Sequence, residues 1–292
     1  MTTSAEPIIV VGYDGSPASE AAAYWAAAEA QLRNAKLRLV HVLVLPVLNS
    51  PMGIARPLQT EPLRRAVERL LDDTRRRIRA EHPDLAIDVV VDFGGAAPVL
   101  LREATKAVLV VVGSRGLGEF RDLAAGSVSA HVATHASCPV VVIPPRWESE
   151  KSAAGVVVGV DGSKISTDAI EFAFQHAQAR HSNLTAVMAW HDPVSAGPGD
   201  QLPLVFSLTV LEQESAALLA ESVAGHAEKY PDVHVKQELV RGHAAEVLID
   251  AGRSAELLVV GSRGRGAFSG LLLGSTSRSL VHHAPCPVAV VR

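Results

Sequence analysis

A repeat divides this chain into two similar halves, and it constrains the fold more than any other feature. The segment VVGYDGS at Val10–Ser16 returns as VVGVDGS at Val157–Ser163, so Asp161 lies 147 residues after Asp14. Each half of the chain has about the 100–150 residues of an ordinary single domain. The repeat predicts two domains of one fold. Their expected ranges are 1–145 and 154–292, joined by a polar linker at 146–153.

A glycine pattern recurs near the end of each half. VVVGSRGLGEFRDLAAGS at Val110–Ser127 corresponds to VVGSRGRGAFSGLLLGS at Val259–Ser275. Each copy has apolar β-formers, then Gly-x-x-Gly, nine residues, and Gly-Ser at the start of a helical pattern. Glycine lets backbone N–H groups turn toward a ligand, and the unpaired N–H groups and positive end of a helix attract anions. The pattern predicts two phosphate sites, and each serine is expected to cap its helix.

Strand and helix patterns alternate within each half. The expected strands are 8–12, 37–45, 86–92, 107–112 and 140–143, then 156–160, 184–190, 233–239, 256–260 and 287–291. Continuous apolar strands separated by helices are typical of a parallel sheet with helices on both faces. In the strand order 3-2-1-4-5, the loops after strands 1 and 4 meet at the switch point, where ligands bind. The predicted fold class is α/β, with two tandem Rossmann-like domains of five parallel strands each.

Composition narrows the functional classes. The formal net charge of -4 argues against a general binder of nucleic acid or anionic membranes. No apolar run approaches the roughly 18 residues that span a bilayer. The polar start, MTTSAEP, lacks the features of a secretory signal, and two cysteines make no disulfide framework. These features predict a cytoplasmic protein without a membrane span.

Asp14 and Asp161 end the first strand of their halves. Asp-Gly-Ser alone is a turn and helix-cap signal. Its predicted place opposite the glycine loop, in both halves, favours a binding role, because a carboxylate accepts hydrogen bonds from ribose hydroxyls or an adenine amino group. Other nucleotide motifs fit poorly. A P-loop sequence is absent, and the Gly-x-Gly at Gly264 and Gly266 follows strand 4 instead of strand 1.

These residues resemble the universal stress proteins, in their tandem-domain, ATP-binding form. The pattern G-x2-G-x9-G-[ST] after strand 4, with an Asp closing strand 1, is the hallmark of that subgroup, and both halves carry it. The resemblance implies the adenine-nucleotide α-hydrolase-like fold and one ATP per domain, with Mg²⁺. It also implies little or no turnover, a role in stress response or growth control, an unknown regulatory protein partner, and often a homodimer.

The resemblance also implies a set of nucleotide-binding residues in each half. Asp14 and Asp161 are expected beside the ribose or base, and the backbone of Val42 and Ala189 beside adenine. Ribose and phosphates are expected at Gly113, Gly116, Gly126, Ser127 and Val128, and at Gly261, Gly264, Gly274, Ser275 and Thr276. Arg115 and Arg263 complete the set on the same loops.

The two glycine loops differ in charge. Arg115, Glu119, Arg121 and Asp122 balance in the first loop, whereas Arg263 and Arg265 leave the second at +2. Because ATP is strongly anionic, we expect tighter binding in the C-terminal half.

Several alternatives remain open. The ligand is ATP, AMP or cyclic AMP, with a three-glycine cradle favouring a polyphosphate. The competing functions are a slow ATPase or nucleotidyl transferase of the same fold group, and a scaffold in which nucleotide is incidental. His131, His135 and Cys138 have metal-like spacing, but the second half does not repeat their pattern, so no metal site is expected from protein side chains. Cys138 and Cys286 are expected to be buried structural thiols, and His41 a core or site-lining residue.

Overall fold

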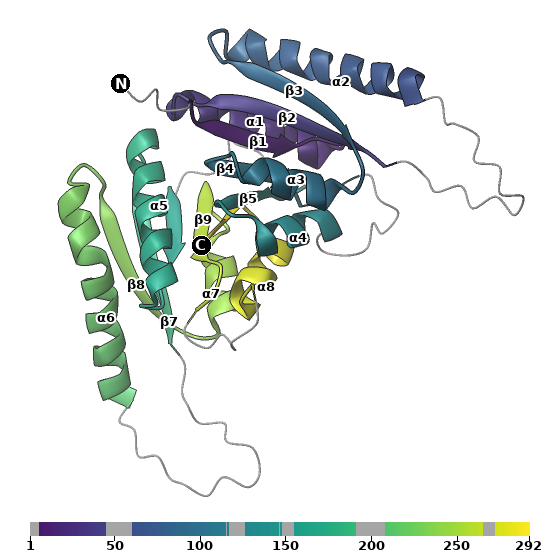
Figure 1. Cartoon of the computed structure of the whole chain (residues 1–292). Helices are drawn as coiled ribbons and strands as arrows, with labels where there is room; N and C mark the ends of the chain where they lie inside the picture. The colour runs from purple at the N-terminus through teal and green to yellow at the C-terminus, as the bar shows by residue number, and fades with distance from the viewer. Residues whose placement is uncertain are drawn as a thin grey trace, which may run out of the picture. The chain divides into compact units, whose positions relative to one another are not determined.

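The chain forms two compact units, Met1–Arg146 and Trp147–Arg292. A computed structural model describes residues 6–44, 60–114, 116, 126–145, 147, 155–190, 208–264 and 272–292. Each unit has five strands alternating with four helices over its described residues (Figure 1). No helix in the described part of the chain is both long and apolar enough to cross a bilayer.

The first unit runs from β1 to β5. Its elements are β1 (Ile8–Gly12), α1 (Pro17–Leu32), β2 (Lys36–Leu43), α2 (Thr60–Glu81), β3 (Ile87–Phe93), α3 (Ala96–Ala104), β4 (Leu109–Gly113), α4 (Ser127–His135) and β5 (Val140–Ile143).

The second unit repeats this series. Its elements are β6 (Val156–Gly159), α5 (Lys164–Arg180), β7 (Leu184–Trp190), α6 (Leu208–Lys229), β8 (Val235–Arg241), α7 (Ala244–Ala251), β9 (Leu257–Gly261), α8 (Ser275–His283) and β10 (Val288–Val291).

The strand order confirms the predicted topology in both units. In the first unit the order is β3-β2-β1-β4-β5, and in the second β8-β7-β6-β9-β10. Every pair within these orders is parallel. The order reverses beside β1 and beside β6, so each unit has one switch point, flanked by the strand that ends in Asp-Gly-Ser and the strand that ends in the glycine loop.

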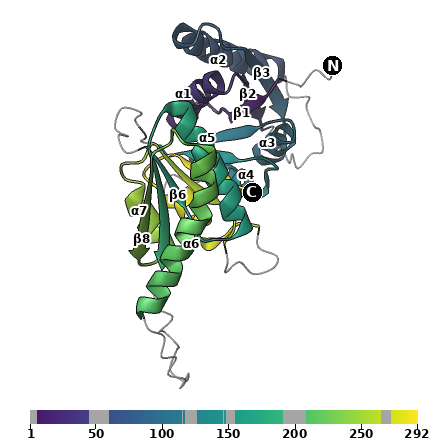
Figure 2. The ribbon, with the colours of Figure 1, turned by 90° about the vertical axis from the view of Figure 1, so that its left-hand side faces the viewer.

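Helices cover both faces of each sheet. Right-handed crossovers place α1 and α2 on one face of the first sheet and α3 and α4 on the other. Helix α1 packs along β1 and β4, α2 along β2 and β3, and α3 along β1 and β2. The second unit follows the same plan, and Figure 2 shows α6 running beside β8, which it contacts.

Small apolar residues build the core, because aromatic residues make up only 4% of the chain. The inner strand β4 (LVVVG) is buried up to its final glycine, and every residue of β5 (VVVI) is buried. Nine residues of α1 are buried, most of them alanines, so this helix lies close against the sheet. Phe174 on α5 is a large exception and is fully buried.

One predicted strand is displaced by two residues. The sequence predicted 233–239, whereas β8 is Val235–Arg241. The reason is the end of the preceding helix, where the Val233 amide donates to the Tyr230 carbonyl at 3.1 Å. Residue 233 therefore belongs to the turn that leaves α6. The predicted end of the second strand, Leu45, lies outside the described residues.

Candidate functional site

The turn after β1 is built by Asp14. Its Oδ1 accepts a hydrogen bond from the Ser16 amide at 3.0 Å, and its own amide donates to Ser19 Oγ at 3.3 Å. Gly15 has a φ of +83°, which a side chain would strain. Ser16 is the N-cap of α1, and its hydroxyl accepts from the Ser19 amide at 3.2 Å. The turn and cap interpretation of Asp-Gly-Ser is therefore correct at the local level.

The second unit repeats this turn. Asp161 Oδ1 accepts from the Ser163 amide at 2.9 Å, and the Asp161 amide donates to Ser166 Oγ at 3.3 Å. Gly162 has a φ of +72°. Ser163 caps α5 by accepting from the Ser166 amide at 3.2 Å. Both aspartates are half-buried, and each carboxylate accepts a hydrogen bond from the backbone.

The carboxylate of Asp14 lies directly over Gly116, the second glycine of the first loop. A Cβ built on Gly116 would overlap Asp14 Oδ2, and a Cβ built on Gly264 would overlap Asp161 Oδ2 in the same way. Both glycines are exposed. The fold thus brings together two motifs that lie about 100 residues apart in the sequence, and it does so twice at the carboxyl edge of a sheet.

The first glycine of each loop has a packing role. A Cβ on Gly113 would lie 2.8–3.0 Å from Ala18 in the first turn of α1. A Cβ on Gly261 would lie 2.9 Å from Ile165 Cγ2 in the first turn of α5. The close approach at these positions is between strand and helix, so Gly113 and Gly261 set the distance between the two elements that frame the site.

Backbone hydrogen bonds close the base of each glycine loop. The Ser114 amide donates to the Ile143 carbonyl at 2.7 Å, and the Gly126 amide donates to the Ser114 carbonyl at 2.6 Å. In the second unit the Ser262 amide donates to Val291 at 2.6 Å and the Gly274 amide to Ser262 at 2.8 Å. These bonds hold the start of α4 or α8 beside the end of the fourth strand, although thirteen residues separate them in the sequence.

The expectation that Ser127 and Ser275 cap their helices is wrong. The N-caps are Gly126 and Gly274, neither of which offers a side chain, and each serine is the first helical residue. The capping interpretation assigned the hydroxyl to the helix amides, whereas Ser127 and Ser275 are exposed at the helix start. A glycine cap leaves the first backbone N–H groups of the helix without a side-chain acceptor.

A second serine in each helix secures the loop, and the sequence analysis missed it. Ser129 is buried, and its hydroxyl donates to the Gly126 carbonyl at 2.9 Å. Ser277 is also buried and donates to the Gly261 carbonyl at 2.7 Å. The recurrence of Ser two residues after Gly-Ser in both halves was the available signal.

The remaining expected residues surround these loops. Val42 and Ala189 are half-buried near the ends of β2 and β7, two residues beyond carbonyls that accept from the Tyr13 and Val160 amides at 2.8 Å. Val128 and Thr276 are half-buried in the first turns of α4 and α8. Arg263 is exposed beside Gly264. Arg115 lies outside the described residues, as do Glu119, Arg121, Asp122 and Arg265.

His41 distinguishes the first site from the second. Burial lowers the pKa of its imidazole below the usual value, although the Tyr13 backbone and the Asp14 carboxylate act in the opposite direction. Its Nδ1 atom is buried and has no hydrogen-bond partner among the described residues. Met188 stands at the corresponding place in β7 and is also buried. His41 is therefore a half-buried neighbour of the first carboxylate, without a counterpart in the second unit.

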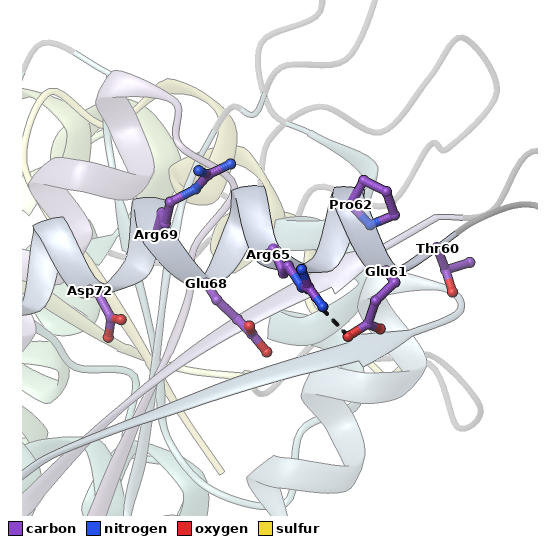
Figure 3. Close-up of a pocket in the computed structure, with 7 residues that line it drawn as sticks. All are labelled: Thr60, Glu61, Pro62, Arg65, Glu68, Arg69 and Asp72. Atoms are coloured by element: carbon purple, nitrogen blue, oxygen red, sulfur yellow. Dashed lines mark ion pairs between the residues drawn. The ribbon is translucent and has the colours of Figure 1, made fainter.

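A separate hollow lies on the surface of α2 (Figure 3). It has a volume of about 930 Å³, and its described lining residues are Thr60, Glu61, Pro62, Arg65, Glu68, Arg69 and Asp72. These residues all belong to one helix, and none belongs to the expected nucleotide set. Arg65 and Glu61 form an exposed ion pair at 3.9 Å within the hollow, an interaction of little energetic weight.

The residues with metal-like spacing, and the second cysteine, pack against other groups of the protein. His131 and His135 stack with ring centroids 4.2 Å apart, and His135 Nδ1 contacts the His131 carbonyl at 2.9 Å. Across the described parts of both units, His, Cys, Asp and Glu form no group of three that could hold a metal ion. Cys138 and Cys286 are buried, as expected. Burial raises the pKa of the Cys286 thiol to about 12.

The fold and these paired loops define the class of protein: a tandem Rossmann-like α/β chain with a carboxylate and a glycine loop at each switch point. The family model described as "Universal stress protein family" matches residues 7–144 and 155–292. The chain therefore belongs to the universal stress protein family, in tandem form.

Individual relatives have the same organisation. The chain is 37% identical over 297 residues to universal stress protein Rv2623 of Mycobacterium tuberculosis, covering 97% of this chain and 96% of that protein. It is 37% identical over 289 residues to a universal stress protein of Mycolicibacterium smegmatis, with the same coverage. A solved universal stress protein from Archaeoglobus fulgidus has the same fold, with a TM-score of 0.70, 19% identity and 97% coverage of both chains.

Proposed function

We propose that each unit binds one ATP with Mg²⁺ at the carboxyl edge of its sheet, and that occupancy regulates the protein in a stress response with little or no turnover. One observation carries this proposal. In both units a fixed carboxylate lies over a bare glycine, beside a helix start that has a glycine cap. A repeated site of this kind suits a ligand that joins a hydroxyl-bearing sugar to an anion.

The hydrogen-bond acceptors and donors of the site suit different parts of a nucleotide. The aspartate carboxylates are acceptors for ribose hydroxyls or the adenine amino group. The first amides of α4 and α8 are donors for phosphate oxygens, supported by about half a positive charge at each helix N-terminus. The exposed hydroxyls of Ser127 and Ser275 add donors at the same helix starts. Mg²⁺ would be held mainly through the phosphates and water, as is usual for this ion.

The second glycine of each loop would let a ligand approach the backbone closely. Gly116 and Gly264 present backbone without a side chain next to the carboxylates, and a methyl group there would occupy the space of the carboxylate oxygen. Binding without turnover is favoured because Asp14 and Asp161 are held by the backbone amides of Ser16 and Ser163. A carboxylate fixed in this way is suited to orienting a hydroxyl rather than to moving a proton.

The first experiment is to denature the purified full-length protein and identify the released small molecules by mass spectrometry. The proposal expects nearly two ATP per chain. Released ADP or AMP would indicate turnover or a monophosphate ligand. The absence of any nucleotide, together with no heat signal on titration with ATP and Mg²⁺, would refute ATP binding.

Single-site variants then assign the nucleotide to each unit. Asp14→Ala and Asp161→Ala are each expected to lower the stoichiometry from two to one. Asp250→Ala is a matched control, because this exposed aspartate on α7 pairs only with its helix neighbour Arg253 among the interactions described. Turnover assays on the double variant Asp14→Ala, Asp161→Ala distinguish slow hydrolysis from contamination.

Membership of the family also supports proposals about assembly. We propose a cytoplasmic homodimer that acts through a regulatory protein partner. Light scattering coupled to size exclusion tests the dimer, and a mass corresponding to 30.7 kDa would refute it. Pull-down with and without ATP tests whether a partner responds to occupancy.

A further inference from the structure

A buried hydrogen bond joins the first site to helix α2. Tyr13 immediately precedes Asp14, and its side chain is 3% exposed. Its hydroxyl shares a 2.9 Å hydrogen bond with the hydroxyl of Thr74, which is fully buried on α2. A Cβ built on Gly15 would lie 3.3 Å from Leu70, one turn earlier on the same helix. The segment that carries the site carboxylate therefore rests directly on α2.

The contact extends through a small polar network. Arg77 donates to Thr74 Oγ1 at 3.4 Å and also pairs with Glu20 in the first turn of α1. The Thr74 hydroxyl also lies 3.1 Å from the Leu70 carbonyl of its own helix. Four residues from three segments thus link α2 to the turn after β1 and to the helix that this turn begins.

This contact involves one of the few buried residues of helix α2. Only four of its 22 residues are buried: Val67, Leu71, Thr74 and Ile78. One of these four is the residue that bonds to Tyr13. An element with few buried residues opens locally at low free energy, so restraint of a neighbouring turn has a measurable effect on its order.

The second unit has replaced every member of the network. The residues corresponding to Tyr13, Glu20, Thr74 and Arg77 are Val160, Thr167, Ser222 and Gly225. Valine and glycine have no side-chain group for such bonds. The Ser222 hydroxyl donates to the Leu218 carbonyl of its own helix at 2.7 Å. The two units therefore share the turn with its aspartate but differ in how that turn meets the neighbouring helix.

We propose that Tyr13 and Thr74 couple nucleotide occupancy of the N-terminal site to the order of α2, and that the C-terminal site lacks this coupling to α6. The inference rests on the proposed ATP site. A ligand that restrains Asp14 also restrains Tyr13 and Gly15, and through them α2. By linkage, an ordered α2 raises the affinity of the N-terminal site by the same factor. Tyr13 is thus a positioning residue for Asp14. Only the N-terminal site is coupled to its neighbouring helix, α2, whereas the C-terminal site is not coupled to α6.

Hydrogen–deuterium exchange with mass spectrometry tests the coupling on the full chain, with ATP and Mg²⁺ as the probe. In the native protein, ATP should slow amide exchange in residues 60–81 and have a smaller effect in 208–229. In Tyr13→Phe and in Thr74→Val, the ATP-dependent slowing over 60–81 should fall about fivefold, the usual effect of one hydrogen bond. The difference with and without ATP is the readout, because a purely structural loss shifts both states together.

Calorimetry gives the reciprocal measurement. In an Asp161→Ala background, which retains the N-terminal site, Tyr13→Phe should weaken ATP binding by the same factor of about five. Ser222→Ala, which removes the corresponding hydroxyl in α6, should change neither the affinity nor the exchange of 60–81. If ATP binds but its effect on 60–81 is the same in Tyr13→Phe as in the native chain, or is equal in 208–229, the coupling is wrong. If no variant binds ATP, the proposed function is wrong and the coupling with it.

Discussion

The two glycines of one motif should fail in different ways when each is replaced by alanine. At Gly116 a methyl group would occupy the space of Asp14 Oδ2, so this oxygen must shift out of the position in which it would meet the nucleotide, while Oδ1 keeps its 3.0 Å bond from the Ser16 amide. A hydrogen bond to a charged group contributes about 1.5–3 kcal/mol. If the same carboxylate orients the nucleotide, Gly116→Ala should raise the Kd of that site by about 10- to 150-fold.

Gly113→Ala should act on stability instead. Its methyl group would lie 2.8 Å from the Ala18 carbonyl carbon and 2.9 Å from the Ala18 Cβ, neither of which can swing aside. Such overpacking costs about 1–3 kcal/mol, which lowers Tm by about 3–10 °C for a unit of this size. Gly116 is exposed, and its φ lies outside the left-handed region, so Gly116→Ala should leave Tm nearly unchanged.

The assay pairs calorimetry with thermal unfolding in an Asp161→Ala background. Gly225→Ala is the control, because a Cβ there meets nothing within 4 Å. It should leave the Kd unchanged and raise the stability of α6 by up to about 1 kcal/mol. A native Kd in Gly116→Ala, or a native Tm in Gly113→Ala, would refute the division of roles between the two glycines.

Three further predictions follow from charge and burial. Because the second glycine loop is the more positive, Asp14→Ala, which retains the C-terminal site, should bind ATP about 3- to 10-fold more tightly than Asp161→Ala. The difference in affinity should become smaller in high salt. Equal dissociation constants in calorimetric titration would count against this prediction. With a thiol pKa of about 12, Cys286 should resist alkylation in the native protein at pH 8 and react once it is unfolded, as mass spectrometry of the labelled chain would show. Burial acts against ionisation of Glu171, but hydrogen bonds from Lys229 and other neighbours outweigh it and lower the pKa of this carboxyl below 4.5. The ionised Glu171 therefore stabilises the folded protein above pH 4.5, and this stabilisation is lost as pH falls through the folded pKa. Glu171→Gln should accordingly lower Tm by a few degrees near pH 7 and by much less near pH 3.

Much of the fold was predictable because the information is local and appears twice. Apolar runs of Val and Leu mark the strands, and the predicted ranges 8–12 and 140–143 are those of β1 and β5 in the structure. The strand order came from the general behaviour of parallel sheets and not from any residue. The meeting of Asp14 and Gly116 follows from that order alone, since nothing local in either motif refers to the other.

What the sequence did not reveal has equally physical causes. Ser127 has the sequence position of a cap, but the chain enters α4 one residue earlier, at Gly126. The nucleotide-binding role of Gly113 stays a prediction, and only the packed structure shows that Ala18 also lies against this glycine. The hydrogen bond between Tyr13 and Thr74 joins residues that are 61 positions apart, and no periodic pattern in the sequence predicts a contact of this kind. Side-chain contacts between segments are where the sequence of one chain is least informative.

The two roles of Asp14 and Asp161, one structural and one proposed for binding, have a consequence for how such proteins evolve. Asp14 and Asp161 order the turn that starts α1 or α5, through the amides of Ser16 and Ser163. A descendant that stopped using its nucleotide would still lose folding stability by mutating this residue, so selection would preserve Asp-Gly-Ser in a site with no ligand. The exposed Gly116 and Gly264 carry no such structural obligation. Replacement of these glycines by larger residues in other sequences would therefore be the better indication that a site no longer binds its ligand.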